Sequence, residues 1–199
     1  MNQHTDRLID HKERTHSPSH WVRTRFFPDM RVPSPDVIDF REIADRGFRV
    51  VLLDIDNTLA VHGSRTGDTF ARGIVTRIEK AGLVPVIVSN ARAGRARAYA
   101  RSLGVSSFIP DAGKPGIEPI CRHLRELGCS PDNALMIGDQ LLTDVWSARR
   151  AGIPVILTDK RSSKELITVR VKRPIETLLR LIGGCSEWKI LGEKGYDCL

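Results

Sequence analysis

Apolar and polar positions alternate along the middle of this chain in two different rhythms. Continuous apolar runs of a few residues, rich in β-branched side chains, are typical of strands buried on both faces of a sheet. We expect five such strands, at 49–54, 84–89, 107–110, 134–138 and 154–158.

Between these runs, apolar residues recur at the spacing of amphipathic helices. Helices are expected at 68–80, 91–103, 115–127 and 143–151, each followed closely by a glycine that can end it. Strands that alternate with helices form right-handed βαβ units. The pattern therefore predicts an α/β fold with a doubly wound parallel five-stranded sheet.

The N-terminal part of the chain follows neither rhythm. Residues 1–24 are mostly polar, and we expect a disordered or loosely held tail. The apolar anchors and prolines of 21–39 predict an extended segment packed on the domain, followed by a short helix from Asp39 to Arg46.

The C-terminal part is expected to contain one more helix. Residues 174–183 place Ile175, Leu178, Leu179 and Ile182 on one helical face, most simply for core packing. The predicted domain then spans 25–183, and 184–199 form a loosely held C-terminal extension.

Two carboxylates stand where the first strand ends. Asp54 and Asp56 follow Val50–Leu53, at the carboxyl edge where open α/β sheets build their sites. On extended backbone, side chains two residues apart point the same way. One carboxylate could then attack a substrate while the other moves a proton, although a solvated turn or a helix cap is the simpler reading of Asp-x-Asp alone.

Further polar residues follow the other strands, and in a parallel sheet their carboxyl ends share one rim. Ser89 and Asn90 end the second strand, and Lys114 precedes the helix at 115. Asp139 ends the fourth strand, with Asp144 close behind. Singly, Ser89 and Asp139 could be helix caps and Lys114 a solvated loop residue. Together they favour phosphoryl transfer at an Mg²⁺ site.

These stretches resemble the four motifs of haloacid dehalogenase (HAD) superfamily phosphatases. The resemblance rests on Asp-Ile-Asp-Asn-Thr-Leu at 54–59, Ser89-Asn90, Lys114-Pro115 and Gly-Asp-Gln-Leu-Leu-Thr-Asp at 138–144. With Phe-Phe-Pro-Asp at 26–29, it is similar to the YqeG family of subfamily IIIA. That family is similar in turn to mitochondrial phosphatidylglycerophosphate phosphatases.

The resemblance implies roles for individual residues. Asp54 would be the nucleophile and a Mg²⁺ ligand, and Asp56 would be the acid and base and would bind the metal through its carbonyl. Asp139 would complete the metal site, with Asp144 behind it. Lys114 would offset negative charge. Phosphate contacts would come from Thr58, Ser89 and Asn90.

The segments between the motifs are short. Residues 59–84 and 90–114 have no room for a cap domain, so we expect an open site that suits a phosphate on a large molecule. The loop 61–65 is the only lid material, and its His62 is read as a solvated residue or a substrate contact. Arg92, at the start of the next helix, is expected to meet the substrate anion.

Composition widens the choice of partners. The 199 residues carry 31 basic and 24 acidic side chains, a net charge of +7, which suits phosphate esters, nucleic acid or acidic lipid. No apolar run is long enough to form a transmembrane segment, although the last helix could touch an anionic membrane. The four cysteines lack the spacing of a metal site, which indicates a cytoplasmic protein. Such a protein could also bind peripherally to a membrane surface.

The sequence thus leaves alternatives to a lipid phosphate phosphatase open. One is a nucleic-acid or phosphoprotein phosphatase, and another is a non-catalytic protein on the same fold that binds RNA or ribosomes. Intact Asp54, Asp56 and Asp139 argue against a non-catalytic relic. Only 6% of residues are aromatic, which leaves few side chains to stack on bases.

Overall fold

A six-stranded, wholly parallel sheet forms the centre of the protein. The computed structural model describes residues 18–161, 177–179 and 181–183. The strand order is β1-β6-β5-β2-β3-β4. The strands are β1 (Met30–Val32), β2 (Val50–Leu53), β3 (Val84–Val88), β4 (Phe108–Ile109), β5 (Ala134–Gly138) and β6 (Val155–Thr158).

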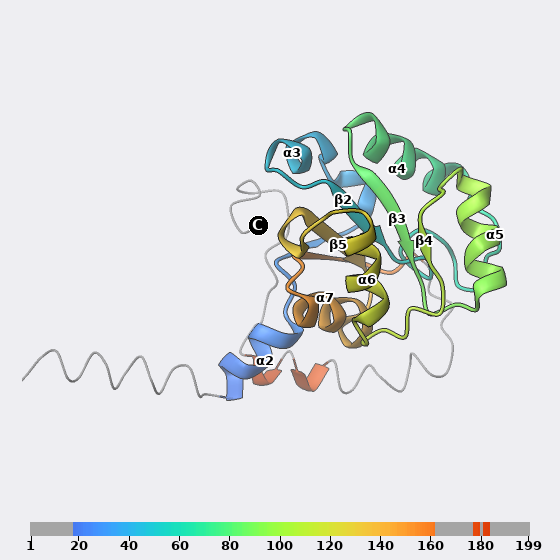
Figure 1. Cartoon of the computed structure of the whole chain (residues 1–199). Helices are drawn as coiled ribbons and strands as arrows, with labels where there is room; N and C mark the ends of the chain where they lie inside the picture. The colour runs from blue at the N-terminus through green and yellow to red at the C-terminus, as the bar shows by residue number, and fades with distance from the viewer. Residues whose placement is uncertain (1–17, 162–176, 180, 184–199) are drawn as a thin grey trace, which may run out of the picture.

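Helices cover both faces of this sheet, as Figure 1 shows. They are α2 (Pro18–Phe26), α3 (Phe40–Asp45), α4 (Thr69–Lys80), α5 (Ala93–Leu103), α6 (Glu118–Glu126) and α7 (Trp146–Ala151). Short 3-10 turns lie at η1 (Pro35–Val37) and η2 (Pro131–Asn133), and one π-helical turn, η3 (Leu141–Val145), leads into α7. The doubly wound α/β fold predicted from the sequence is confirmed.

Alternation along each strand divides the core in two. In β2, Val51 and Leu53 pack with α3, α4 and α5, whereas Val50 and Leu52 pack with α6 and α7. A strand covered on both faces has no solvent side, which explains why β2 reads as an unbroken apolar run.

Three predictions need correction. The sheet has six strands rather than five, because Met30–Val32 pairs in parallel with β6. The segment 21–39 is not extended throughout, since its first residues belong to α2. That helix runs across the expected tail boundary at residue 24, and it buries Val22 and Phe26.

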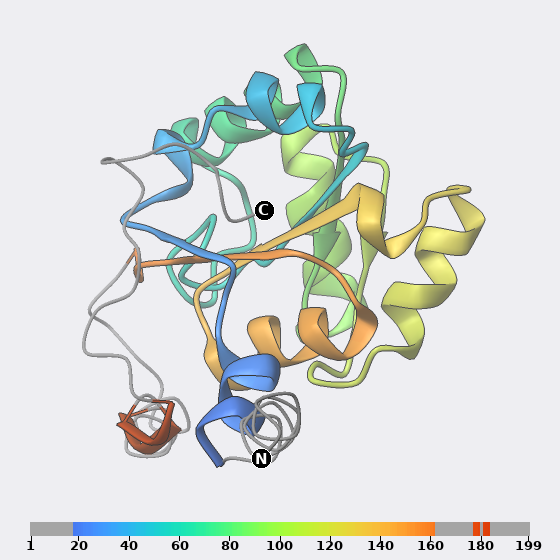
Figure 2. The same cartoon turned by 90° about the vertical axis from the view of Figure 1, so that its left-hand side faces the viewer.

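Helix α2 adds an outer layer beside α7. Phe26 packs against Trp146 of α7, with the two rings tilted and their centroids 5.1 Å apart. Both views place the two helices side by side (Figure 1, Figure 2). Burial of an aromatic and a valine offsets the entropy of ordering this otherwise polar segment.

The C-terminal predictions fall mostly outside the described residues. The expected helix at 174–183 is described only at 177–179 and 181–183, and these residues are helical up to a final turn. The extension 184–199 lies outside the described residues. Among the described helices, none has both the length and the apolar character needed to cross a bilayer.

The connections that could hold a cap domain are short. Between β2 and β3 the chain forms one loop and α4, and between β3 and Lys114 it forms α5, β4 and turns. The carboxyl rim of the sheet therefore carries no inserted domain in either connection, as predicted.

Candidate active site

Adjacent strands bring two acidic residues together at the carboxyl rim. Leu53 of β2 lies opposite Ile137 of β5, and the Asp54 N–H donates to the Ile137 carbonyl at 3.0 Å. Asp54 follows β2 directly, and Asp139 follows β5. Each side chain is buried, with 6% of the residue's surface exposed. The sheet register itself therefore sets these two carboxylates side by side.

Lys114 is buried against this pair. Its Nζ donates at 2.6 Å to Asp54 Oδ1, at 2.6 Å to Asp144 Oδ1 and at 3.0 Å to the Val88 carbonyl. Burial by itself would lower the pKa of Lys114, but Asp144 and Asp54 hold this pKa above its ordinary value. The group is a fixed ammonium with all three protons donated, not a solvated loop residue.

The end of β3 holds the Lys114 backbone in place. The Asn90 amide makes two hydrogen bonds to it, from Nδ2 to the Lys114 carbonyl at 2.9 Å and from the Lys114 N–H to Oδ1 at 2.8 Å. The Ser89 hydroxyl accepts from the Ala91 N–H at 3.0 Å, so it caps this turn. Accepting that bond leaves its own proton able to donate to a ligand.

Three carboxylates gather here. Asp54, Asp139 and Asp144 each place an oxygen within 4.8 Å of the others. Asp144 is fully buried, and its Oδ2 accepts from the Gln140 N–H at 3.1 Å. A Cβ on Gly138 would lie 2.4 Å from the Asp144 side chain, so glycine is required for this close approach.

The carboxylates of the cluster are costly to keep ionised within the described chain. Burial raises the pKa of Asp139 from 3.8 to about 9, with Asp144 and Asp54 adding to the effect. Burial and the Asp144 charge also raise the pKa of Asp54, to about 7, against the opposing charge of Lys114. Both Asp139 oxygens and Asp54 Oδ2 are buried without a hydrogen-bond partner in the described chain.

These orphaned oxygens fit a divalent cation. Among the described residues, two of the three carboxylates, those of Asp54 and Asp144, make ion pairs with one ammonium, that of Lys114, so acids outnumber bases in these contacts. A hard cation such as Mg²⁺ takes carboxylate oxygens as ligands and would satisfy them. Asp144 is the member already committed to Lys114 and Gln140, which leaves Asp54 and Asp139 as the carboxylates with free oxygens.

Asp56 lies in a separate environment. Arg95 of α5 donates to both of its oxygens, from Nη1 to Oδ2 at 2.8 Å and from Nη2 to Oδ1 at 2.5 Å. Oδ1 also accepts from the Gly63 N–H at 3.0 Å and lies 3.2 Å from His62 Nδ1. Burial would raise the pKa of Asp56, but the Arg95 and Gly63 hydrogen bonds lower it overall.

Arg95 is the residue that sequence reasoning missed. Its helix was singled out for Arg92 instead, which the structure leaves exposed at the N-cap of α5. His62 does touch the site, through Asp56. The spacing of the arginines along α5 is only a weak signal for Arg95. Which arginine contacts Asp56 depends on the position of the loop from 61 to 64, and the sequence does not reveal that position.

Residues 57–59 form the turn after Asp56. Asn57 has a φ of 63°, and its carbonyl accepts from the Arg161 N–H at 2.8 Å. The Arg161 guanidinium donates to the Leu59 carbonyl at 2.5 Å. The Thr58 hydroxyl is buried and lacks a partner within the described chain. Arg161, also missed from the sequence, thus braces the turn that carries Thr58.

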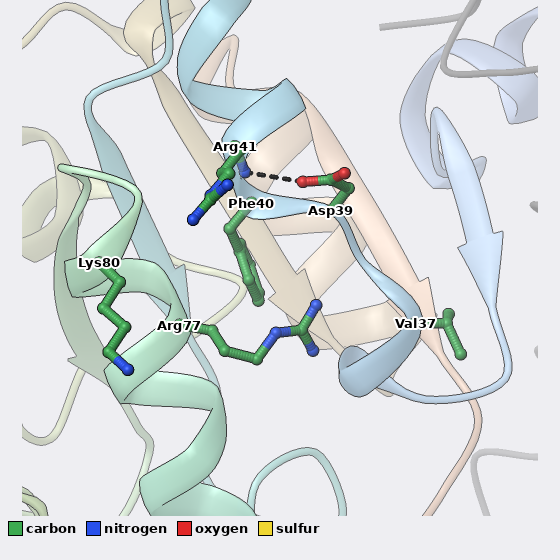
Figure 3. Close-up of a pocket in the computed structure, with 6 residues that line it drawn as sticks. All are labelled: Val37, Asp39, Phe40, Arg41, Arg77 and Lys80. Atoms are coloured by element: carbon green, nitrogen blue, oxygen red, sulfur yellow. Dashed lines mark hydrogen bonds between the residues drawn. The ribbon is translucent and has the colours of Figure 1, made fainter.

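A separate hollow of about 430 Å³ contains none of these residues. Val37, Phe40 and Arg77 line it together with the polar side chains of Asp39, Arg41 and Lys80, as Figure 3 shows. Arg77 donates to the Asp36 and Ile38 carbonyls at 2.6 and 2.5 Å. It ties the 36–38 segment to α4, so we assign this hollow a structural role.

Comparison with known proteins shows what the chain resembles in sequence. Residues 111–174 match the HAD-hydrolase-like family model. A probable phosphatase, YqeG of Bacillus subtilis, is 28% identical over 76% of this chain and 87% of its own length. A chloroplastic and mitochondrial phosphatidylglycerophosphate phosphatase of Arabidopsis thaliana is 26% identical over 88% of this chain and 52% of its own.

A solved structure has a related shape. The putative HAD superfamily (subfamily III A) hydrolase of Legionella pneumophila aligns with a TM-score of 0.42 and 15% identity, over 73% of this chain and 88% of its own. The family assignment itself rests on the matches in sequence. These matches identify the protein as a HAD-like hydrolase, and over most of its length it is similar in sequence to the probable phosphatase YqeG.

Proposed function

We propose that the protein hydrolyses phosphate monoesters with Mg²⁺ and through an aspartyl-phosphate on Asp54. One observation carries the proposal. Lys114 holds Asp54 by Oδ1, while Oδ2 is buried without a partner in the described chain. A carboxylate that a buried ammonium holds in place, with one oxygen still unpartnered, is positioned to act as a metal ligand and as a nucleophile.

The reaction would proceed in two displacements. A carboxylate oxygen of Asp54 attacks phosphorus, the ester P–O bond breaks, and the leaving oxygen takes a proton from Asp56. Water then attacks the aspartyl-phosphate and gives a proton to Asp56, and the bond from phosphorus to Asp54 breaks. Asp56 is ionised at rest, ready for the second step, and must carry a proton for the first.

The remaining groups would bind and neutralise the phosphoryl group. Lys114 offsets the charge on Asp54, and the Ser89 and Thr58 hydroxyls can donate to phosphoryl oxygens. Asn90 acts through the Lys114 backbone that it holds. Arg92, exposed on the rim, is proposed to contact the substrate anion.

Asp54, Asp139 and the Asp56 carbonyl would hold Mg²⁺, with Asp144 orienting Lys114 behind them. When bound, the metal would supply positive charge between the phosphate and the carboxylates. The chain itself holds one oxygen of each of the three acids within 4.8 Å of the others in a buried site. The raised pKa values of Asp54 and Asp139 reflect the energetic cost of that arrangement.

For the substrate we propose a lipid phosphate such as phosphatidylglycerophosphate, or another large phosphate ester. The short β2–β3 and β3–Lys114 connections support an open site. Two relatives are phosphatidylglycerophosphate phosphatases, although the alignments span 52% and 59% of their lengths. The net charge of +7 would also favour peripheral contact with an anionic membrane.

A substrate panel tests the proposal. Purified protein with Mg²⁺ is assayed for phosphate release from p-nitrophenyl phosphate, phosphatidylglycerophosphate in mixed micelles, nucleotides and a phosphopeptide. We expect hydrolysis that Asp54→Asn abolishes, while Asp132→Asn, an exposed matched control, keeps wild-type rates. Full activity of Asp54→Asn would refute the nucleophile, and a preference for nucleotide or phosphopeptide would refute the lipid substrate.

A further inference from the structure

Arg95 engages the proton-transfer residue more completely than any other side chain among the described residues. Its two terminal nitrogens bond the two oxygens of Asp56, at 2.8 and 2.5 Å. Its Nε donates to the Ser64 carbonyl at 3.1 Å. A two-point pair of this kind fixes the plane of a carboxylate as well as its position, which a lysine could not do.

The remaining contacts distinguish the two oxygens of Asp56. Oδ1 accepts from Arg95 and the Gly63 N–H, and His62 Nδ1 lies 3.2 Å away. Within the described chain, Oδ2 accepts a hydrogen bond from Arg95 alone. A carboxylate oxygen can accept about two hydrogen bonds, so Oδ2 is the one that retains room for a reacting proton.

The same arginine links the loop at 61–64 to Asp56. Gly63 and Ser64 belong to the turn at 61–64, and the Ser64 N–H donates to the Val61 carbonyl at 3.2 Å. Arg95 meets this turn at the Ser64 carbonyl, and the turn returns the Gly63 N–H to Asp56. Helix α5, the loop and the carboxylate therefore form one closed set of contacts.

We propose that Arg95 is a positioning residue for the second displacement: it orients Asp56 so that Oδ2 takes the proton from the water that attacks the aspartyl-phosphate. This rests on the proposed function, because it needs Asp54 as the nucleophile. Arg95 acts through Asp56 and makes no contact of its own with the phosphoryl group.

The test separates the two displacements. p-Nitrophenolate leaves without needing a proton, so formation of the aspartyl-phosphate from p-nitrophenyl phosphate does not depend on Asp56, whereas its hydrolysis does. General-base catalysis contributes roughly 10²–10⁴-fold. We expect Arg95→Met to lower kcat about 10- to 100-fold and to lower KM in parallel, so that kcat/KM stays within about threefold.

Three further measurements accompany kcat and KM. Rapid mixing should show a burst of p-nitrophenol equal to the enzyme concentration in Arg95→Met and in Asp56→Asn. The double variant should turn over no more slowly than Asp56→Asn alone, because Arg95 acts only through that residue. Arg95→Lys should recover part of the rate. Arg97→Met, an exposed arginine of the same helix, should behave as wild type.

Several outcomes would overturn the inference. A raised KM at unchanged kcat would mean that Arg95 binds substrate directly. Additive losses in the double variant, or lost activity without a burst, would place its effect elsewhere. Wild-type kinetics in Arg95→Met would leave it no role. Activity retained by Asp54→Asn would instead refute the proposed function, which keeps the two failures distinct.

Discussion

Asp139 offers a test of whether this protein sacrifices stability for its site. Its carboxyl is buried, neither oxygen has a partner in the described chain, and two further acids lie near it. Substitution by asparagine keeps the size of the side chain but removes the charge. We predict that Asp139→Asn makes the metal-free protein more stable while it abolishes catalysis.

The magnitude follows from the pKa of Asp139, which burial raises from 3.8 to about 9. Between these values the folded state binds a proton that the unfolded state has lost, so the free energy of unfolding falls as pH rises. Each pH unit above 3.8 lowers the free energy of unfolding by about 1.4 kcal/mol, so the Asp139 carboxyl destabilises the fold by about 4 kcal/mol at pH 7 and by about 1.6 kcal/mol at pH 5. Local relaxation reduces both, so we expect a gain of about 2–4 kcal/mol at pH 7 and about 1 kcal/mol at pH 5.

Urea unfolding in EDTA at these two pH values measures the difference. Mg²⁺ should then raise the Tm of the wild type, because a ligand that binds only the folded state stabilises it, and should leave Asp139→Asn unchanged. Asp132→Asn, at an exposed position, should match the wild type throughout. A less stable Asp139→Asn at pH 7, or a gain that does not change with pH, would refute the reasoning.

Two further substitutions probe the packing around the site. Lys114→Met should lower the free energy of unfolding in EDTA by about 3–5 kcal/mol, because Asp54 and Asp144 then lose their buried partner. Lys80→Met, on the surface, should change this free energy little. Equal urea midpoints for the two variants would contradict this prediction. Phe26→Ala should cost about 3 kcal/mol through lost packing on Trp146, whereas Trp21→Ala, half exposed on the same helix, should cost less than 1 kcal/mol; a Tm unaffected by Phe26→Ala would show that α2 does not stabilise the domain.

The parts of the fold that the sequence predicted are those with strong local signals. The buried runs that became β2, β3, β5 and β6 have no polar face, and α4 (Thr69–Lys80) lies within the expected range 68–80. The parallel orientation of these strands follows from general rules for βαβ connections. The rim residues Asp54, Ser89 and Asp139 could therefore be placed on one edge of the sheet.

The parts that were missed depend on distant partners. β1 is three residues long, and only its pairing with β6, more than a hundred residues later, makes it a strand. Helix α2 has a weak apolar periodicity and contains a histidine and two arginines, so its burial against α7 could not be read locally. Tertiary packing overrides propensity in both cases.

Asp54 and Asp56 show most clearly where prediction from the sequence pattern ends. Side chains alternate only on extended backbone, but β2 ends at Leu53, and the Leu59 and Ala60 N–H groups donate back to the Ile55 carbonyl. The period of two therefore does not apply, and the acids acquire different partners: Lys114 for Asp54, and Arg95 for Asp56. Because both partners come from beyond β3, the different surroundings of two residues so close in sequence are set by the sheet and by α5, not by the motif that contains them.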